Sequence, residues 1–191
     1  MAFAAGVLIV TALVGWLVNR LRPPELRAFL IGALVAWILV GIGTSFHHAR
    51  IIGDSMAPLF SDGDHVLVST LPYRFREPKR EDVVALYYPL NPDKSFVERV
   101  IAEEGDAVRI VDGRVYLNDI PMRDAYVGAD FRSHDNFGPV IVPEGYVFVL
   151  GDHRNHSTDS RHWGFVPKKY VWGRVVTSIW RASSHQSNSP R

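Results

Sequence analysis

Long uncharged apolar runs occupy the first fifty positions of the chain, and short apolar stretches between turn-forming residues occupy the rest. Residues 1–19 and residues 28–46 contain no charged side chain. Each run is close to the roughly 20 apolar residues with which a helix crosses a bilayer. No basic segment precedes Phe3, which argues against a cleaved export signal. The pattern therefore predicts two transmembrane helices, joined by a loop at residues 20–27.

The loop between the two runs is basic. Arg20, Arg22 and Arg27 stand there against a single acidic residue, Glu25. Loops rich in Lys and Arg stay on the cytoplasmic side of a membrane. We therefore expect both chain ends on the opposite side, with residues 47–181 forming a tethered domain outside the cytoplasm.

The pattern after residue 47 indicates β structure. Short apolar or alternating runs are bounded there by Gly, Pro, Asp and Asn, which is typical of antiparallel strands. The runs are HVLVS, DVVALYY, FVERVIA, AVRIV, RVYLN, PVIV, GYVFVLG and GRVVTSIW. Residues 111–119 predict a hairpin with Asp112 and Gly113 at its turn. The chain is therefore predicted to be mainly β, an antiparallel all-β domain behind two helices, with a disordered tail at residues 182–191.

Composition narrows the chemistry. The 191 residues carry a net charge of +1 and no cysteine. A disulfide, a cysteine-ligated zinc site and a thiol nucleophile are thereby excluded, and nothing in the charge favours a nucleic-acid partner. His153, His156 and His162 lie close to Asp152 and Asp159 in the sequence, and these residue types ligate zinc. Their spacing matches no helical ligand motif, so we expect neither a metal nor another cofactor.

Three segments carry polar residues in an order suited to a serine hydrolase. They are GDSMAPLFSDGDHVLV, RVIAEEGD and FGPVIVPEGYVFVLGDHRNHSTDSRHWGFVP. Ser55 lies in the first segment, where turn chemistry alone would explain it. Together with the paired apolar runs, however, the three segments resemble those of bacterial type I signal peptidases. The resemblance covers nearly the whole chain except the tail, and it is most specific over residues 151–167.

The resemblance implies a membrane-bound serine endopeptidase of the bacterial cytoplasmic (inner) membrane that removes signal peptides from exported preproteins. Such enzymes use a serine nucleophile and a neutral lysine as general base, and they accept A-x-A sequences bound as an extended strand. By resemblance, Ser55 is the nucleophile and its N–H contributes to the oxyanion hole. Ser157 orients the base, Asp159 and Arg161 support the site, and Met56 contacts substrate.

One position departs from this family pattern. Glu98 stands where the resemblance implies the catalytic lysine, and Ala102 and Glu104 replace a usual glycine and a common proline. Lys94 is a candidate substitute. On an extended strand it lies four residues, or about 13 Å, from Glu98. That distance is too long for Lys94 to replace the missing lysine without a bulge.

Three hypotheses for Glu98 follow. Glu98 is itself the base, provided that burial raises its pKa from about 4.3 toward about 6–7. Alternatively His153 or His156 is the base, as in the endoplasmic-reticulum relatives of this family. In the third hypothesis the domain does not cut, and it binds signal-peptide-like segments or a partner signal peptidase. Cleavage by Ser55 is the primary hypothesis, with weak or absent activity expected until lysine is restored at position 98.

Overall fold

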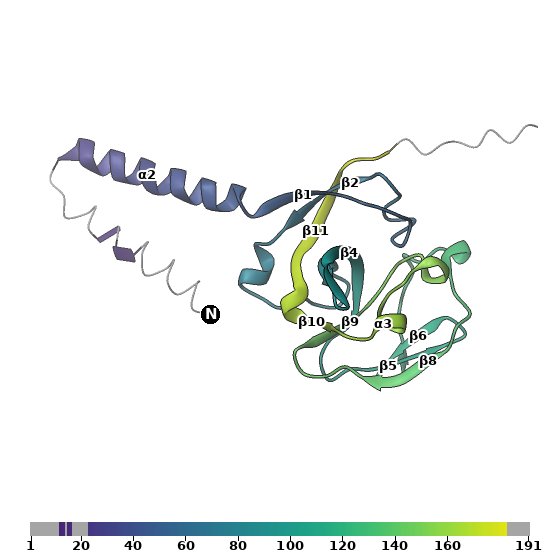
Figure 1. Ribbon diagram of the computed structural model, residues 1–191. Coiled ribbons are helices and arrows are strands. Elements are labelled where there is room, and N and C mark those ends of the chain that lie inside the picture. The colour runs from purple at the N-terminus through teal and green to yellow at the C-terminus, as the bar shows by residue number, and fades with distance from the viewer. Residues whose placement is uncertain (1–11, 14, 17–22, 183–191) are drawn as a thin grey trace, which may run out of the picture.

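One long helix projects from a β domain (Figure 1). The computed structural model describes residues 12–13, 15–16 and 23–182. Helix α2 spans Pro24–Gly43 and buries none of its side chains. In the described part of the chain it is the one helix long and apolar enough to cross a membrane. Most of the helix predicted at residues 1–19 lies outside the described residues.

The predicted bounds of the second apolar helix were wrong at both ends. The helix begins at Pro24 rather than residue 28, because proline fits the first turn, where its missing N–H would have no partner. Residues 24–27 therefore belong to the helix and not to the predicted loop. At the other end, Phe46 pairs with Ser69 in the first strand, so backbone pairing ends the helix before residue 46.

Seven antiparallel strands form the larger sheet, which contains the candidate site. Their order is β1, β2, β11, β3, β4, β9 and β10. The strands are β1 (Phe46–Arg50), β2 (His65–Ser69), β11 (Val171–Trp180), β3 (Val83–Tyr88), β4 (Asn91–Ala102), β9 (Tyr146–Leu150) and β10 (Val166–Pro167). The mainly β, antiparallel prediction is confirmed, and each of the eight predicted runs contributes a strand to one of the two sheets.

A smaller sheet packs beside β4 and β9 (Figure 1). It contains β7 (Ile120–Pro121), β6 (Arg114–Leu117), β5 (Ala107–Val111) and β8 (Phe137–Ile141), in that order. The predicted hairpin is confirmed, since Val111 pairs with Arg114. Asp112 and Gly113 both have positive φ, 46° and 72°, as a two-residue hairpin turn requires.

Short helices occupy the connections. They are Pro72–Arg74, Ala129–Phe131, Arg154–His156, α3 (Ser160–Trp163) and Lys168–Tyr170.

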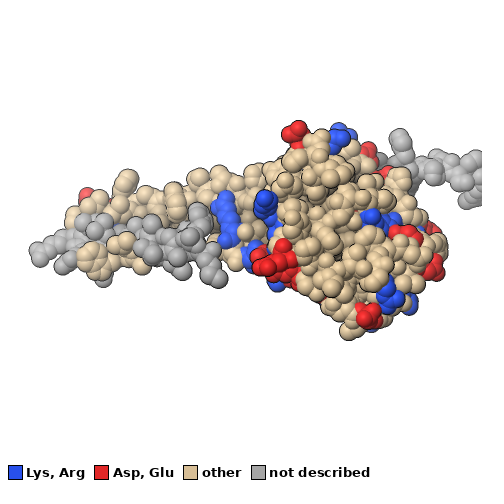
Figure 2. Space-filling view, turned by 60° about the horizontal axis from the view of Figure 1, so that its bottom comes forward, with Lys and Arg blue, Asp and Glu red and all other residues tan. Residues whose placement is uncertain are grey.

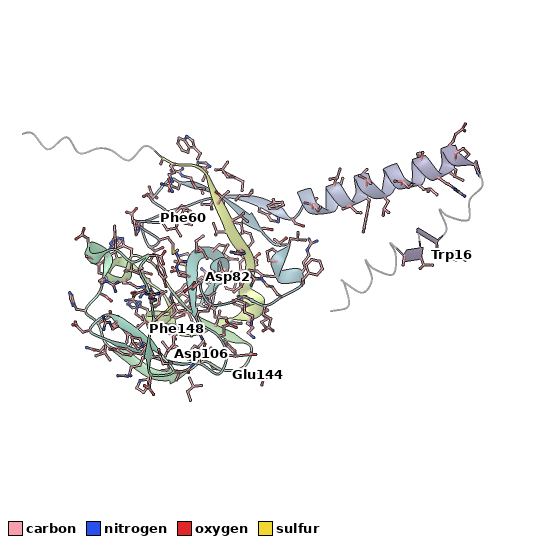
Figure 3. All side chains as sticks on the ribbon, turned by 180° about the vertical axis from the view of Figure 1, so that it is seen from behind. Trp16, Phe60, Asp82, Asp106, Glu144 and Phe148 are labelled. Atoms are coloured by element: carbon pink, nitrogen blue, oxygen red, sulfur yellow. The ribbon has the colours of Figure 1, made fainter. Side chains whose placement is uncertain are left out.

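Three apolar clusters stabilise the β domain. Phe148 belongs to the cluster shared by the two sheets, and Phe60 belongs to a second cluster around β2 (Figure 3). A third cluster surrounds Val84 and Val100 on the central strands. Charged side chains gather on the surface of the β domain, whereas the projecting helix shows few of them (Figure 2). This division fits a water-exposed domain on an apolar anchor.

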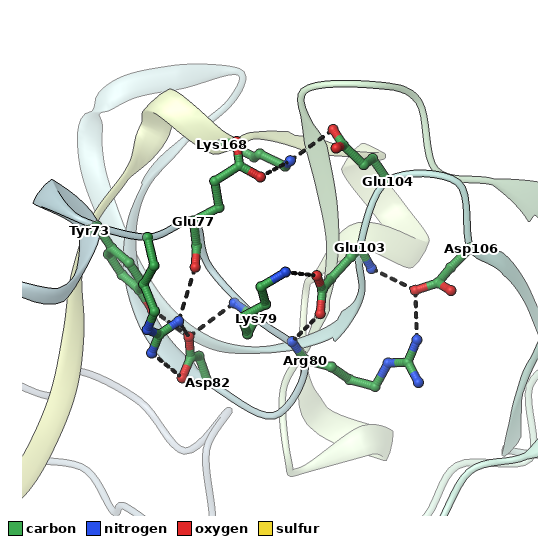
Figure 4. Close-up of polar contacts among 10 residues, drawn as sticks. Tyr73, Glu77, Lys79, Arg80, Asp82, Glu103, Glu104, Asp106 and Lys168 are labelled. Carbon is green, nitrogen blue, oxygen red and sulfur yellow. Dashed lines mark hydrogen bonds and ion pairs between the residues drawn. The ribbon is translucent and has the colours of Figure 1, made fainter. Parts of the chain in front are cut away.

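Ion pairs connect the segment before β3 to the turn after β4 (Figure 4). Arg76 pairs with Asp82 at 2.7 Å. Lys79 pairs with Glu103 at 2.8 Å, and Arg80 with Asp106 at 2.9 Å. The Lys79 and Arg80 pairs join the start of β3 to the end of β4. This is one end of the antiparallel pair, next to the position where Glu98 pairs with Val84.

Glu104, which stands where the family commonly has proline, forms polar contacts in the same region. Its carboxylate accepts a hydrogen bond from the Gly145 N–H at 2.8 Å and pairs with Lys168 Nζ at 2.8 Å. A carboxylate can hold both groups, which proline could not. The departure from the family pattern at this position therefore serves the fold.

Candidate active site

Ser55 lies in the turn that follows β1, and it is half-buried. Gly53 opens this turn with φ +86°, a conformation that favours glycine. The Gly53 N–H donates to Asp62 Oδ1 at 2.8 Å. The Ser55 carbonyl accepts a hydrogen bond from the His153 N–H at 2.9 Å. The serine turn is thus fixed to the loop that follows β9.

Gly151 permits the close approach of the two candidate serines. A Cβ at Gly151 would lie 2.4 Å from Ser157 Oγ and 2.5 Å from the Ser55 carbonyl oxygen. Both distances are shorter than any tolerated contact, so only glycine fits. The structure therefore brings Ser55 and Ser157 to the same small region.

Asp159 and Arg161 fix this region from behind. Asp159 is fully buried, and Arg161 binds it through Nε at 2.8 Å and Nη2 at 2.7 Å. Asp159 Oδ2 also accepts the Gly151 N–H at 3.1 Å. Arg161 reaches Asp135 as well, at 3.0 Å. This bidentate pair holds the backbone at Gly151 and is geometrically well ordered.

Glu98 lies in the middle of the larger sheet. It pairs with Val84 of β3, and the pairing of Arg99 with Leu150 places Gly151 next to it on the β9 side when the antiparallel register is continued. Its exposed fraction is 0%. Neither carboxyl oxygen has a hydrogen-bond partner among the described residues.

This environment disfavours a charge on Glu98. Burial raises the pKa of Glu98 well above its ordinary value, and the negative charges of Asp159 and Asp152 raise it further, with Arg161 opposing them. A buried carboxyl without a partner takes up a proton because the ion cannot be solvated. Glu98 is therefore favoured as a neutral acid, which can donate one hydrogen bond and accept others.

Ser157 is the second polar group with unused hydrogen-bonding capacity in this region. Its Oγ is buried and has no partner among the residues that the structure describes. Buried hydroxyls normally find a partner. Glu98 and Ser157 thus flank Gly151 with free donors and acceptors, an arrangement typical of a reactive site rather than of a packed core.

A buried ion pair next to Glu98 was not predicted from the sequence. Arg99 donates to both oxygens of Asp152, through Nε at 2.7 Å and Nη2 at 2.5 Å. The Tyr126 ring lies 4.0 Å from the guanidinium carbon. The signal that was available is a charged residue inside an otherwise apolar strand, since such a residue needs a partner when buried.

Arg154 is a second buried cation that sequence reasoning missed. Its Nε donates to the Gly151 carbonyl at 3.0 Å, and its Nη1 lies 3.4 Å from Asp124 Oδ2. Both peptide groups of Gly151 are therefore held by charged side chains, one by Asp159 and the other by Arg154.

A groove of about 370 Å³ runs beside Ser55. Residues 50–52 and 55–56 line one part of it, and residues 94–97 of β4 line another. Met56 contributes to the lining and is only 1% exposed. A groove with a largely apolar lining along a β-strand is suited to an extended peptide with small side chains.

Lys94 lies in this groove, but not beside Glu98. The β3–β4 register is regular from Ser95 to Glu98, and its irregularity falls between Asn91 and Ser95. The separation of about 13 Å along the strand therefore remains. Lys94 is also exposed to solvent.

His153 is the histidine closest to the nucleophile turn. Its Nδ1 lies 3.0 Å from the Asp54 carbonyl oxygen. Because a carbonyl only accepts, Nδ1 carries the hydrogen and the neutral ring would leave Nε2 as an acceptor. His156 is exposed and contacts the His153 ring at 5.3 Å between centroids. Across the described residues, no group of three or more His, Cys, Asp or Glu could hold a metal ion.

Comparison with known proteins finds similarity over most of the chain. The sequence profile described as "Signal peptidase, peptidase S26" matches residues 25–180. "Probable signal peptidase I-2" from Synechocystis sp. is 34% identical over 163 residues, covering 82% of this chain and 72% of that protein. "Thylakoidal processing peptidase 1, chloroplastic" from Arabidopsis thaliana is 38% identical over 184 residues, covering 88% of this chain and 52% of that protein. A crystal structure of a signal peptidase I from Enterococcus faecalis is 30% identical, covers 53% of this chain and 98% of that one, and has a TM-score of 0.47.

Proposed function

The chain belongs to the signal peptidase family, peptidase S26, and from this premise we propose that it is a membrane-anchored serine endopeptidase that removes signal peptides from exported preproteins. Ser55 is the nucleophile of this proposal, and its N–H contributes to the oxyanion hole. The observation that carries the proposal is the meeting of Ser55, Gly151 and Ser157 beside the buried Glu98. The groove next to Ser55 gives the peptide a place to lie.

The proposal places the protein in the bacterial cytoplasmic membrane. Helix α2 is one anchor, and the apolar run at residues 1–19 is the second. The β domain then lies on the extracytoplasmic side, where the cleavage point of a signal peptide emerges from the bilayer. The short connection from Gly43 to Ser55 keeps the groove close to the membrane surface, which supports a peptide segment emerging from the bilayer as substrate.

The proposed supporting roles follow from the contacts around Gly151. Asp159 and Arg161 are positioning residues, because they hold the peptide group of Gly151 and not the reacting atoms. Ser157 is the hydroxyl that orients the base. Met56 forms part of the apolar floor against which a small substrate side chain packs.

In this proposal, the protonation state of the general base limits the cleavage rate of the wild type. A general base must be deprotonated at the working pH. The burial of Glu98 and the nearby negative charges favour its neutral acid. Glu98 is therefore a base only at a pH above its raised pKa, and we expect slow cleavage by the wild type at neutral pH.

The same observation favours a second candidate function. A chain whose base position holds a neutral acid can still bind an extended peptide in the groove. In that case the protein is a non-catalytic homologue that holds signal-peptide-like segments or assists a partner signal peptidase. The two candidates share the groove and differ only in whether Ser55 forms an acyl intermediate.

The experiment is cleavage of a purified preprotein with an A-x-A signal peptide by the full chain in detergent. Ser55→Ala should abolish any cleavage, because the nucleophile supplies almost all of the acyl-transfer rate. Ser61→Ala is the matched control, an exposed serine in the same loop, and it should leave the rate unchanged. Cleavage that survives in the Ser55→Ala variant would remove Ser55 from the mechanism.

A further inference from the structure

The groove beside Ser55 has an uneven charge. Its lining contains two cations, Arg50 and Lys94, and no acidic residue. Both cations are exposed. Neither forms an ion pair with another residue in the part of the chain that the structure describes, whereas Arg99 and Arg161 near the same site are both paired. The two groove cations therefore remain available to a bound molecule.

The cations come from two different strands. Arg50 ends β1, and Lys94 lies on the outer part of β4. The larger sheet places β2, β11 and β3 between these two strands, so the charges approach the groove from separate elements. The rest of the lining is largely apolar, with buried Ile51 and Met56. The groove thus combines a largely apolar lining with a basic residue at each wall, Lys94 on β4 and Arg50 at the end of β1. The Arg50 guanidinium itself lies beside Gly63, with Nη2 3.7 Å from where a Cβ of that residue would stand.

The length of the groove limits where a complementary charge can lie. Four consecutive residues of β4, 94–97, form one wall. An extended peptide advances about 3.3 Å per residue, so this wall faces about four residues of a bound segment. A charged substrate side chain outside that window does not reach the two cations.

We propose that Arg50 and Lys94 make this groove selective for peptides that carry an acidic side chain within about four residues of the cleaved bond. The inference rests on the proposed function, because it assumes that the groove binds the substrate peptide. It adds a charge preference to the small apolar residues already expected. Exposed ion pairs contribute roughly a two- to fivefold change in affinity each, and salt weakens them.

The test is peptide binding to the full chain in detergent, in the Ser55→Ala background so that no peptide is cut. Three fluorescent A-x-A peptides are compared by anisotropy, identical except for Asp, Ala or Lys at one position inside the window. The Asp peptide should bind about fivefold more tightly than the Ala peptide, and the Lys peptide more weakly. Raising the salt to about 0.5 M should reduce the difference.

Charge reversal assigns the preference to the groove. Lys94→Glu and Arg50→Glu should each reduce or invert the order of the Asp and Lys peptides, with Lys94→Gln in between. Arg114→Glu is the matched control, because Arg114 is an exposed cation in the smaller sheet. It should leave the order unchanged. An unchanged unfolding midpoint identifies the folded variants.

The possible outcomes distinguish a failure of this inference from a failure of the proposed function. Loss of the preference in the groove variants, with its retention in Arg114→Glu, supports the inference. Tight binding of the Ala peptide without any charge preference would overturn the inference and leave the proposed function intact. Failure of all three peptides to bind would overturn the proposed function, and the inference with it. An equal preference in every variant would show that residues other than Arg50 and Lys94 recognise the acidic side chain, which would overturn the inference.

Discussion

Replacing Glu98 with glutamine should make the protein more stable at neutral pH, and the gain should grow with pH. The folded state raises the pKa of Glu98 well above its ordinary value of 4.5, so it binds the proton more tightly than the unfolded chain does. Stability from this group is therefore complete below pH 4.5 and falls as the pH rises toward the folded pKa. For each pH unit between 4.5 and the folded pKa, the wild type loses about 1.4 kcal/mol of this stability. Glutamine does not titrate and avoids this loss.

The assay is urea unfolding of the full chain in detergent, followed by tryptophan fluorescence at several pH values. Glu103→Gln is a control, because folding shifts the pKa of Glu103 in the opposite direction to that of Glu98. Although burial raises the pKa of Glu103, hydrogen bonds from Lys79 and Arg80 lower it below its ordinary value. Its carboxylate therefore contributes stability that is complete above pH 4.5 and is lost as the pH falls through the folded pKa. Glu103→Gln should be less stable than the wild type above pH 4.5, and this difference should shrink at lower pH. Parallel pH curves for wild type and Glu98→Gln would refute the buried, neutral Glu98.

Two further perturbations test the site and the topology. Gly151→Ala should lower the free energy of unfolding by about 1–3 kcal/mol and abolish peptide cleavage, because its methyl group would meet Ser157 and the Ser55 carbonyl. The unfolding midpoint measures the first effect, and a cleavage assay measures the second. Gly41→Ala, where the methyl group meets open space, should change neither, and full activity in Gly151→Ala would contradict the described geometry. A reporter active only in the cytoplasm should give a signal when fused after Pro24 and none at the C-terminus; reversed signals would overturn the orientation.

Local sequence signals predicted most of the β domain. Short apolar runs bounded by turn residues correspond to its strands, because alternation and turn chemistry act over a few neighbouring residues. The hairpin at Asp112 and Gly113 is the clearest case, since the turn type demands positive φ at both residues. The family resemblance singled out Ser55 and Ser157, and the structure places both against Gly151.

Local sequence signals could not predict contacts between distant segments. Arg99 and Asp152 are separated by 53 positions, and no pattern in either segment identifies the other as its partner. The predicted helix bounds were wrong for a different reason. The start depended on whether Pro24 ends one helix or begins the next, and the end depended on strand pairing by Phe46. The environment of Glu98 required the arrangement of Asp152, Asp159 and Arg161 in space.

The measurement that tests the central claim most directly is cleavage of an A-x-A preprotein by the Glu98→Lys variant. A lysine at this buried position has its neutral form favoured by burial and can take the Ser55 proton. We expect cleavage to rise above the wild-type rate and to vanish in the Glu98→Lys, Ser55→Ala double variant. A folded Glu98→Lys variant that cuts no faster than wild type, or a double variant that still cuts, would contradict the assignment of Ser55 and position 98 as nucleophile and base.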